Sequence, residues 1–267
     1  MSELTQAEVT TMSPKEFRQF VRRKEWIRRT EFVCRGYVQA NLAIVPKEYA
    51  FDFLLFCNRN PRPCPLLDVT EPGDPRPKLM APEADLRTDL PKYCVYENGK
   101  LVAEPTDVTN YWRDDLVSFL LGCSFSFEWA LQAANVRSRL IGTYIGNIRC
   151  VPAGRFSGPM AISCRLIKGS HDAVRAVQIS SRYTAAHGPP VHIGDPRLIG
   201  IKDIMHSAVW SPDYPVPPQE RDEIPMFWGC GVTPQMVALE SRLPLMIAHC
   251  PGHMFITDRL GEEMAVT

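Results

Sequence analysis

The chain has 267 residues, 45% of them hydrophobic, with 30 basic and 30 acidic side chains and a formal net charge of zero. A chain of this size and composition can bury a proper core, and it lacks the bulk charge that would attract nucleic acid or an anionic membrane. No apolar run approaches the roughly 20 residues of a membrane-spanning helix. We therefore expect a soluble protein with no nucleic-acid or membrane partner, located in the cytoplasm or, in a eukaryote, in the mitochondrial matrix.

The N-terminal region is locally basic between residues 18 and 29, as mitochondrial transit peptides are. Glutamates interrupt this run, however, and such peptides are poor in acidic residues. Ser13-Pro14-Lys15-Glu16 has the pattern of a capping box with proline at the first helical position. We therefore expect a surface helix here.

The next segments predict a β–α–β beginning. Residues 37–45 are typical of a strand, 47–60 of a helix and 62–69 of an extended segment. Residues 70–91, rich in Pro, Asp and Lys, predict a long ordered loop. Residues 92–104 predict a β-hairpin, because Asn98-Gly99 supplies a tight turn.

The middle of the chain predicts a helix over residues 114–134, or two helical turns meeting at Gly122, buried because the polar members sit among large apolar ones. Residues 141–151 and 158–167 are typical of strands, and 171–185 of a helix. This region resembles a small layered unit of its own.

The last part returns to alternating elements. Residues 224–230 predict a strand and 233–242 a helix, with Thr233 as N-cap and Pro234 at the first position; residues 243–250 predict another strand. The expected fold is α/β, with a mixed-sheet main domain (1–135 and 213–267) and a smaller two-layer α+β domain (136–212) inserted in the middle of the chain.

Nine cysteines are scattered along the chain. Their odd number and scatter favour free thiols in a reducing compartment. No CxxC pair occurs, so we expect no structural zinc site and no thioredoxin-type motif.

Two cysteine-containing segments could carry chemistry. GCGVTP (229–234) places a tight turn at a helix N-terminus, which is either an anion cradle or a plain turn. GCSFSFE (122–128) contains Cys123, which is a nucleophile if its pKa is lowered and otherwise a small core residue. Glu128 in the same segment is either an acid or base with a raised pKa, or the partner of an arginine.

The segment HGPPVHIGDP (187–196) concentrates His187, His192 and Asp195 among glycines and prolines. It could be a metal cage, a catalytic loop or a rigid turn. The spacing of the two histidines fits no common zinc pattern, so we expect no metal here.

Several of these segments together resemble the D-glutamate cyclase family, also described as hydro-lyases, which has bacterial and mitochondrial members. The similarity covers residues 20 to 260, nearly the whole chain. The segments that carry it are RPCPLLD (62–68), DLVSFLLGCSFSFE (115–128), VPAGRFSGPM (151–160), HGPPVHIGDP (187–196), PMFWGCGVTPQ (225–235) and PGHMFITD (251–258).

The resemblance implies a two-domain α/β enzyme that dehydrates D-glutamate to 5-oxo-D-proline without a nucleotide or other cofactor. Attack of the α-amine on the γ-carboxyl needs a base, an acid and donors for the oxyanion. We expect acid, base or nucleophile roles for His192, His187, Glu128, Asp195 and Cys123.

Substrate binding requires groups that accept carboxylates. Arg149 or Arg155 could bind the α-carboxylate bidentately, and the turn Gly229-Cys230-Gly231-Val232 could cradle an oxyanion or carboxylate, with His253 nearby in sequence. Given the resemblance, we interpret HGPPVHIGDP as an active-site loop that its prolines make rigid.

The chain also departs from the family pattern. Ile145 stands where the family has an arginine, with Arg149 as a replacement candidate, and residues 212–216 lack an acidic residue of the family. Two alternatives therefore stay open: a non-catalytic binding protein for a small acid, and a dehydratase of another small hydroxy or amino acid. The expected partner is in each case a small anionic acid, and a homodimer is left open.

Overall fold

The computed structural model describes residues 4–207, 209–212 and 214–266. Position 213 lies outside the described residues. It is the predicted start of the second segment of the main domain, and it also falls within residues 212–216, where the sequence differs from the family pattern. Among the described residues, no helix is both long and apolar enough to cross a bilayer.

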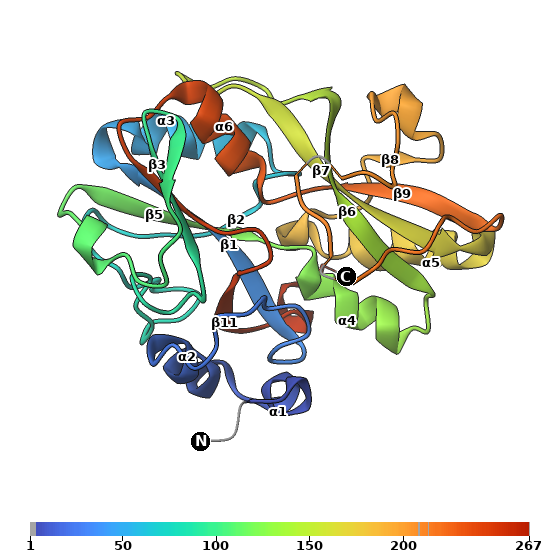
Figure 1. The fold of residues 1–267 in the computed structure, drawn as a ribbon, viewed down its shortest axis with the longest axis horizontal. Coiled ribbons are helices and arrows are strands. Elements are labelled where there is room, and N and C mark those ends of the chain that lie inside the picture. The colour runs from blue at the N-terminus through green and yellow to red at the C-terminus, as the bar shows by residue number, and fades with distance from the viewer. Residues whose placement is uncertain (1–3, 208, 213, 267) are drawn as a thin grey trace.

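Two sheets lie side by side (Figure 1), with helices packed around them. The first sheet has the order β2-β5-β1-β10-β3-β4, with β11 also paired to β1. Its strands are β1 (Tyr37–Pro46), β2 (Leu66–Val69), β3 (Tyr93–Glu97), β4 (Lys100–Ala103), β5 (Leu116–Gly122), β10 (Met246–His249) and β11 (Phe255–Leu260).

The second sheet has the order β6-β7-β9-β8. Its strands are β6 (Ser138–Arg149), β7 (Pro159–Lys168), β8 (His192–Ile193) and β9 (Glu223–Gly229). The α-helices are α1 (Gln6–Thr11), α2 (Pro14–Arg22), α3 (Lys47–Arg59), α4 (Phe125–Ala133), α5 (Gly169–Ser181) and α6 (Thr233–Ser241). Short 3₁₀ turns are η1 (Thr109–Tyr111), η2 (Thr184–Ala186), η3 (Pro196–Ile199) and η4 (Glu262–Met264).

The α/β class is confirmed, while the sheet pairing differs in one respect from the expected mixed sheet. Every strand pair in the described residues is antiparallel. Strand β9 pairs with β7 in the second sheet, although it follows the predicted insertion 136–212. The second sheet therefore contains a strand from outside the predicted inserted domain. The division of the chain into domains stays a prediction.

The predicted helix over 114–134 is wrong in its first half. Residues 116–122 form β5, which is buried throughout and pairs with β1 on one side and β2 on the other. A short apolar run suits a buried helix or a central strand equally well. The two neighbouring strands decide between these states, because β1 and β2 supply the backbone hydrogen-bond partners that a helix would have found within itself.

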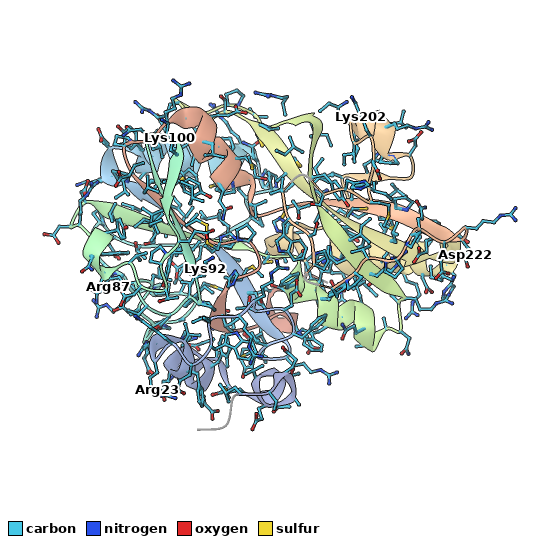
Figure 2. All side chains as sticks on the ribbon, in the orientation of Figure 1. Arg23, Arg87, Lys92, Lys100, Lys202 and Asp222 are labelled. Atoms are coloured by element: carbon cyan, nitrogen blue, oxygen red, sulfur yellow. A yellow bond between two sulfur atoms is a disulfide. The ribbon has the colours of Figure 1, made fainter. Side chains whose placement is uncertain are left out.

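The core is continuous between the sheets. One cluster of buried side chains joins Phe53 of α3 and Phe119 of β5 to Phe227 of β9. Helix α4 follows β5 of the first sheet but packs Phe127 and Leu131 against the second. Charged side chains such as Arg23, Lys100, Lys202 and Asp222 lie at the periphery (Figure 2).

The expectation of nine free thiols needs one correction. Cys94 of β3 and Cys250, directly after β10, form a disulfide. The strands β3 and β10 are hydrogen-bonded neighbours, so residues 156 apart in sequence are brought together. The other seven cysteines are free.

Candidate active site

A partly enclosed cavity lies between the two sheets, where two strand-to-helix turns meet. Its total empty volume, part of which is open to solvent, is about 410 Å³. The described lining residues come from both sheets and both turns, and none of them is an acid, a lysine or an arginine. They are Asn41, Cys123, Ser124, Phe125, Leu140, Thr143, Ser163, Trp210, Cys230, Val232, His249, Pro251, Gly252 and Met254.

The two turns, β5 to α4 and β9 to α6, are built alike. In each, a strand ends at a glycine and a cysteine follows directly, as Gly122-Cys123 and Gly229-Cys230. Gly122 has no room for a side chain, because a Cβ there would lie 1.7 Å from the carbonyl oxygen of Ala185. Each cysteine lies just before a nine-residue helix. At such a helix N-terminus, free backbone N–H groups and the helix dipole favour negative charge.

The two cysteines are protonated thiols near neutral pH. Burial raises the pKa of Cys123 to about 12, although the backbone N–H of Phe125 opposes the shift. Burial also raises the pKa of Cys230, opposed by the N–H of Val232 and by the hydroxyl of Thr143, whose Oγ1 lies 3.8 Å from the sulfur. Because the thiolate is the nucleophilic form, neither group is a ready nucleophile, and each retains an S–H that it can share with a bound molecule.

Three polar atoms in the cavity wall lack a hydrogen-bond partner within the described structure. They are Ser163 Oγ, Trp210 Nε1 and His249 Nε2, and all three are shielded from solvent. Buried polar atoms in folded proteins are almost always paired. Three of them around one cavity indicate a polar molecule that supplies the missing partners.

His249 is the one ionisable side chain of the cavity besides the two thiols. It ends β10, and its Nδ1 lies 3.2 Å from the backbone nitrogen of Leu42 and 3.3 Å from the carbonyl oxygen of the same residue. Burial lowers the pKa of His249 to about 4. The imidazole is therefore neutral at physiological pH, with Nε2 available for a bound molecule.

The loop 187–196 lies along the edge of the second sheet and does not line this cavity. His187 is buried with a left-handed backbone (φ 77°), and its Nδ1 lies 2.6 Å from the carbonyl oxygen of Arg62. Burial lowers the pKa of His187 to about 4. His192 Nε2 lies 2.9 Å from the carbonyl oxygen of Asp195. These contacts stabilise the loop itself.

Asp195 is engaged within the same loop. Its carboxylate accepts from the guanidinium of Arg197, with Oδ2 2.8 Å from Nη2, and from the backbone N–H of Arg197. These hydrogen bonds lower the pKa of Asp195 to about 2. The side chain acts as the N-cap of η3 and stays ionised.

Glu128 forms an ion pair with an arginine. Of the two roles predicted for it, acid or base and arginine partner, the structure has the second. Both Nε and Nη2 of Arg165 donate to Glu128 Oε2, at 3.0 and 2.8 Å. The Arg165 guanidinium is fully buried, lies over the rings of Phe127 and Trp228, and donates to Ser124 Oγ at 3.2 Å. Since Ser124 lines the cavity, this ion pair supports the cavity wall from behind.

The predicted substrate-binding arginines also lie elsewhere. Arg149 is exposed and 3.8 Å from Glu240, and Arg155 is exposed and lies over the ring of Tyr49. Ile145 is exposed on β6. His253 belongs to a neighbouring surface hollow, and burial lowers its pKa.

A larger hollow of about 1130 Å³ lies over the loop 70–91. It is open, and the charged groups around it are already paired with one another, as in Arg76–Asp74, Arg87–Asp85 and Arg22–Asp89. It therefore offers fewer unmet hydrogen-bonding groups than the cavity between the sheets.

Of the predicted site residues, the cavity contains Cys123, Cys230 and Val232, with Gly229 and Gly231 in the backbone beside them. Sequence reasoning missed His249, Ser163, Thr143 and Asn41. A signal existed for His249, which ends the apolar run LPLMIAHC and so had to be a buried polar group in need of partners. Asn41 and Ser163 are similar cases in strands β1 and β7.

The fold is that of an α/β protein with a cavity between two sheets. The sequence profile of a family described as D-glutamate cyclase matches residues 117–258. A protein of Geobacillus kaustophilus named "Putative hydro-lyase" is 55% identical over 262 residues, covering 96% of this chain and 97% of that protein. One of Bacillus subtilis with the same description is 50% identical, covering 96% of this chain and 100% of that protein. The chain belongs to the D-glutamate cyclase family.

Among solved structures, a nitrogen repressor-like protein of Methanococcus jannaschii aligns with 81% of this chain and 86% of its own. The TM-score is 0.39 at 9% identity.

Proposed function

We propose that this member of the family converts D-glutamate to 5-oxo-D-proline and water in the cavity between the sheets. One observation carries the proposal: two helix N-terminal turns, each with a protonated thiol, meet at a cavity that also contains a neutral histidine and unpartnered donors.

The two carboxylates of the substrate match the two turns. Each turn presents backbone N–H groups at the positive end of a helix, a good environment for a carboxylate or an oxyanion. We assign the reacting γ-carboxyl to the turn at Cys230 and the α-carboxylate to the turn at Cys123. Ser163 and Trp210 then satisfy their unpaired polar atoms on the bound molecule.

The chemistry requires a proton to be carried from nitrogen to oxygen. The neutral His249 accepts a proton from the substrate ammonium, the amine attacks the γ-carbon, and the oxyanion rests on the donors of the turn. A thiol donates a proton to the departing oxygen, and the proton held by His249 returns to that thiol. The nitrogen loses its second excess proton as the amide forms, and the same path through His249 and the thiol carries it to the departing oxygen, which leaves as water. Two protons thus pass from nitrogen to oxygen, and the reaction needs no net proton.

The test is incubation with D-glutamate and detection of 5-oxoproline by mass spectrometry, with L-glutamate as the stereochemical control. Product from D-glutamate that disappears in His249→Asn supports the proposal. Absence of product from D-glutamate overturns the assigned substrate.

A second candidate follows from the uncharged lining of the cavity, which fits less charged hydroxy or amino acids as well. A panel of these acids in the same assay tests for dehydration. Binding of one of them without loss of water would identify a small-acid binding protein. The cytoplasmic location and the homodimer stay predictions.

A further inference from the structure

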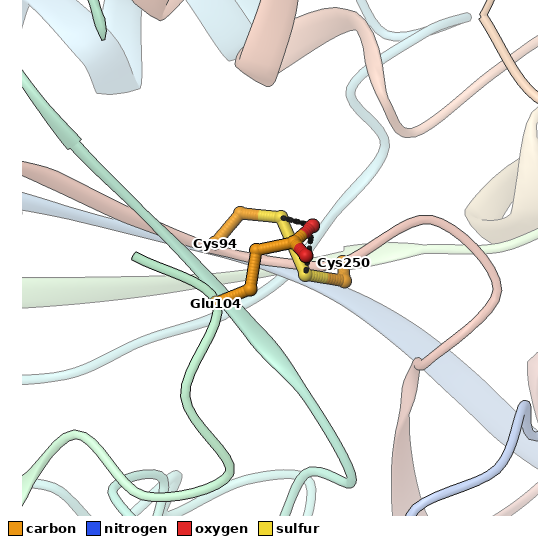
Figure 3. Close-up of side chains that lie close together, drawn as sticks. All are labelled: Cys94, Glu104 and Cys250. Carbon is orange, nitrogen blue, oxygen red and sulfur yellow. Dashed lines mark hydrogen bonds between the residues drawn. A yellow bond between two sulfur atoms is a disulfide. The ribbon is translucent and has the colours of Figure 1, made fainter. Parts of the chain in front are cut away.

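The disulfide between Cys94 and Cys250 has an acidic neighbour. Glu104 follows β4 and directs its carboxylate at both sulfur atoms (Figure 3), with Oε1 3.8 Å from Cys94 Sγ and 3.7 Å from Cys250 Sγ. Both cysteines are buried, whereas the Glu104 side chain is 46% exposed. The three side chains form a group whose candidate ligand atoms all lie within 4.8 Å of one another.

The position of Glu104 suits a reduced pair better than an oxidised one. A disulfide sulfur carries no hydrogen, so it offers the carboxylate nothing to accept. A thiol would donate to it, and a cation would be shared by all three groups. The other carboxylate oxygen, Oε2, is 2.9 Å from Lys92 Nζ, so only Oε1 needs a partner on the sulfur side.

We propose that the reduced protein binds a thiophilic divalent cation, represented by Zn²⁺, through Cys94, Cys250 and Glu104. Ligand atoms around a tetrahedral zinc ion lie about 3.3–3.8 Å apart, given typical zinc–sulfur and zinc–oxygen bonds. The two oxygen-to-sulfur distances of 3.8 and 3.7 Å fit this spacing. The ligands lie in β3 or directly after β4 and β10, with Cys250 far from the other two in the chain, which is why no spacing in the sequence reveals them.

The charges and the redox step balance. A dithiol reductant supplies two electrons and two protons, which convert the disulfide to two thiols, and the reductant becomes a disulfide. Metal binding then releases both thiol protons to solvent. Two thiolates and one carboxylate exceed the charge of the cation by one, and the ammonium of Lys92 offsets that excess.

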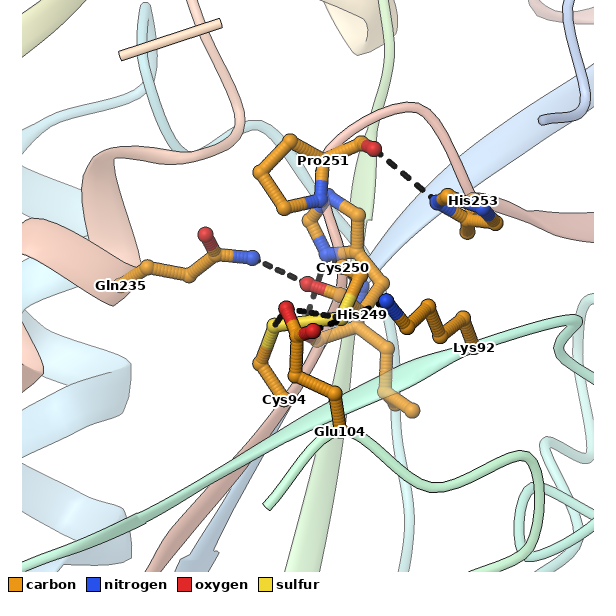
Figure 4. Close-up of a disulfide and its surroundings, with 9 residues drawn as sticks. Lys92, Cys94, Glu104, Gln235, His249, Cys250, Pro251 and His253 are labelled. Atoms are coloured by element: carbon orange, nitrogen blue, oxygen red, sulfur yellow. Dashed lines mark hydrogen bonds and ion pairs between the residues drawn. A yellow bond between two sulfur atoms is a disulfide. The ribbon is translucent and has the colours of Figure 1, made fainter. Parts of the chain in front are cut away.

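The site leaves one tetrahedral position open, and the exposure of Glu104 gives the ion a route from solvent. It also adjoins the cavity, because His249 and Pro251 flank Cys250 in the chain and both line it (Figure 4). Oxidation would release the metal, so the site holds either a disulfide or an ion.

The experiment uses the full chain, reduced and freed of metal, titrated with Zn²⁺ against a chromophoric chelator. We expect one ion per chain in the reduced protein and none at this site after oxidation to the disulfide. Cobalt(II) in place of zinc should give the charge-transfer absorption of thiolate ligands. Glu104→Gln should weaken binding at least tenfold, and because this side chain is half-exposed the variant should fold normally.

The controls separate this site from other cysteines. Cys94→Ser should abolish binding, whereas Cys57→Ser, in the core on α3, and Cys230→Ser, in the cavity, should retain it. Equal binding by the oxidised protein, no binding by the reduced protein, or full binding by Glu104→Gln would each overturn the proposal. The readout is metal binding, so it stands apart from the assay for D-glutamate.

Discussion

Asn41 and Gly231 are in such close contact that a Cβ on Gly231 would lie 1.9 Å from the side-chain nitrogen of Asn41. The same nitrogen donates to the carbonyl oxygen of Gly122 at 2.6 Å. Asn41, in the middle of β1, thus touches both turns that border the cavity. A single side chain of the first sheet sets the distance between the two helix N-termini.

Replacing Gly231 with alanine should therefore displace Asn41 and damage the site. Overpacking of this kind costs about 1–3 kcal/mol in the free energy of unfolding, and we expect activity to fall by more than stability explains. Thermal unfolding and turnover of D-glutamate measure the two effects. Gly158→Ala is the matched control, because its new Cβ would meet the side chains of Val237 and Glu240 only at 3.3 Å or more, a much milder contact. Equal losses in both variants would contradict this account of Asn41.

His249→Asn should lower turnover about 10²–10⁴-fold, the range for loss of a general acid or base. His192→Asn should retain most of the activity, because His192 contacts its own loop and not the cavity. The comparison needs steady-state kinetics and a circular dichroism spectrum of each variant. An inactive His192→Asn variant together with an active His249→Asn variant would assign the catalytic role to His192 in the loop 187–196.

The cavity thiols should act as acids and form no covalent intermediate, since burial raises the pKa of Cys123 to about 12. Cys123→Ser keeps a hydroxyl donor and should lose less turnover than Cys123→Ala. Mass spectrometry of the intact protein during turnover should detect no thioester. An adduct on Cys123 would instead identify it as the nucleophile.

Glu128→Gln should destabilise the protein strongly, because it leaves the fully buried Arg165 cation without a counter-charge. Breaking a buried pair from one side costs about 3–5 kcal/mol, measurable by urea unfolding. Asp195→Asn, in the solvent-exposed pair with Arg197, is the control and should change the unfolding midpoint little. A Glu128→Gln midpoint close to wild type would show that solvent or another group compensates Arg165.

Stability should fall as the pH drops from about 6.5 to about 4. Burial lowers the pKa of His187 and of His249 from 6.5 to about 4 in the folded protein. Between these values the unfolded chain binds more protons than the folded one, so acid favours unfolding, by up to about 1.4 kcal/mol per pH unit for each site. Urea unfolding at several pH values measures the slope, which His187→Asn should reduce; an unchanged slope would mean that His187 is protonated when folded.

Much of the fold could be predicted from local patterns. The hairpin at Asn98-Gly99 forms as expected, as β3 and β4. The helix N-terminus at Ser13 also forms, with the Ser13 hydroxyl accepting from the Glu16 N–H at 3.3 Å. These features depend on residues close in sequence. Residues 116–122 were predicted wrongly as helix because their state depends on β1 and β2, which lie far away in the chain.

The sequence by itself determined the family and the glycine–cysteine turn at Gly229-Cys230 that opens a helix, since both are written in continuous segments. It placed Gly122-Cys123 inside a helix, whereas the structure has a strand ending there. Only the tertiary structure decided which polar groups share a site. It brings Cys123, Cys230 and His249 to one cavity. It ties HGPPVHIGDP to the carbonyl oxygen of Arg62 through His187 and to its own backbone through His192. The physical reason is that a site between two sheets is assembled by strand pairing and core packing over long separations, and these leave no fixed spacing in the sequence.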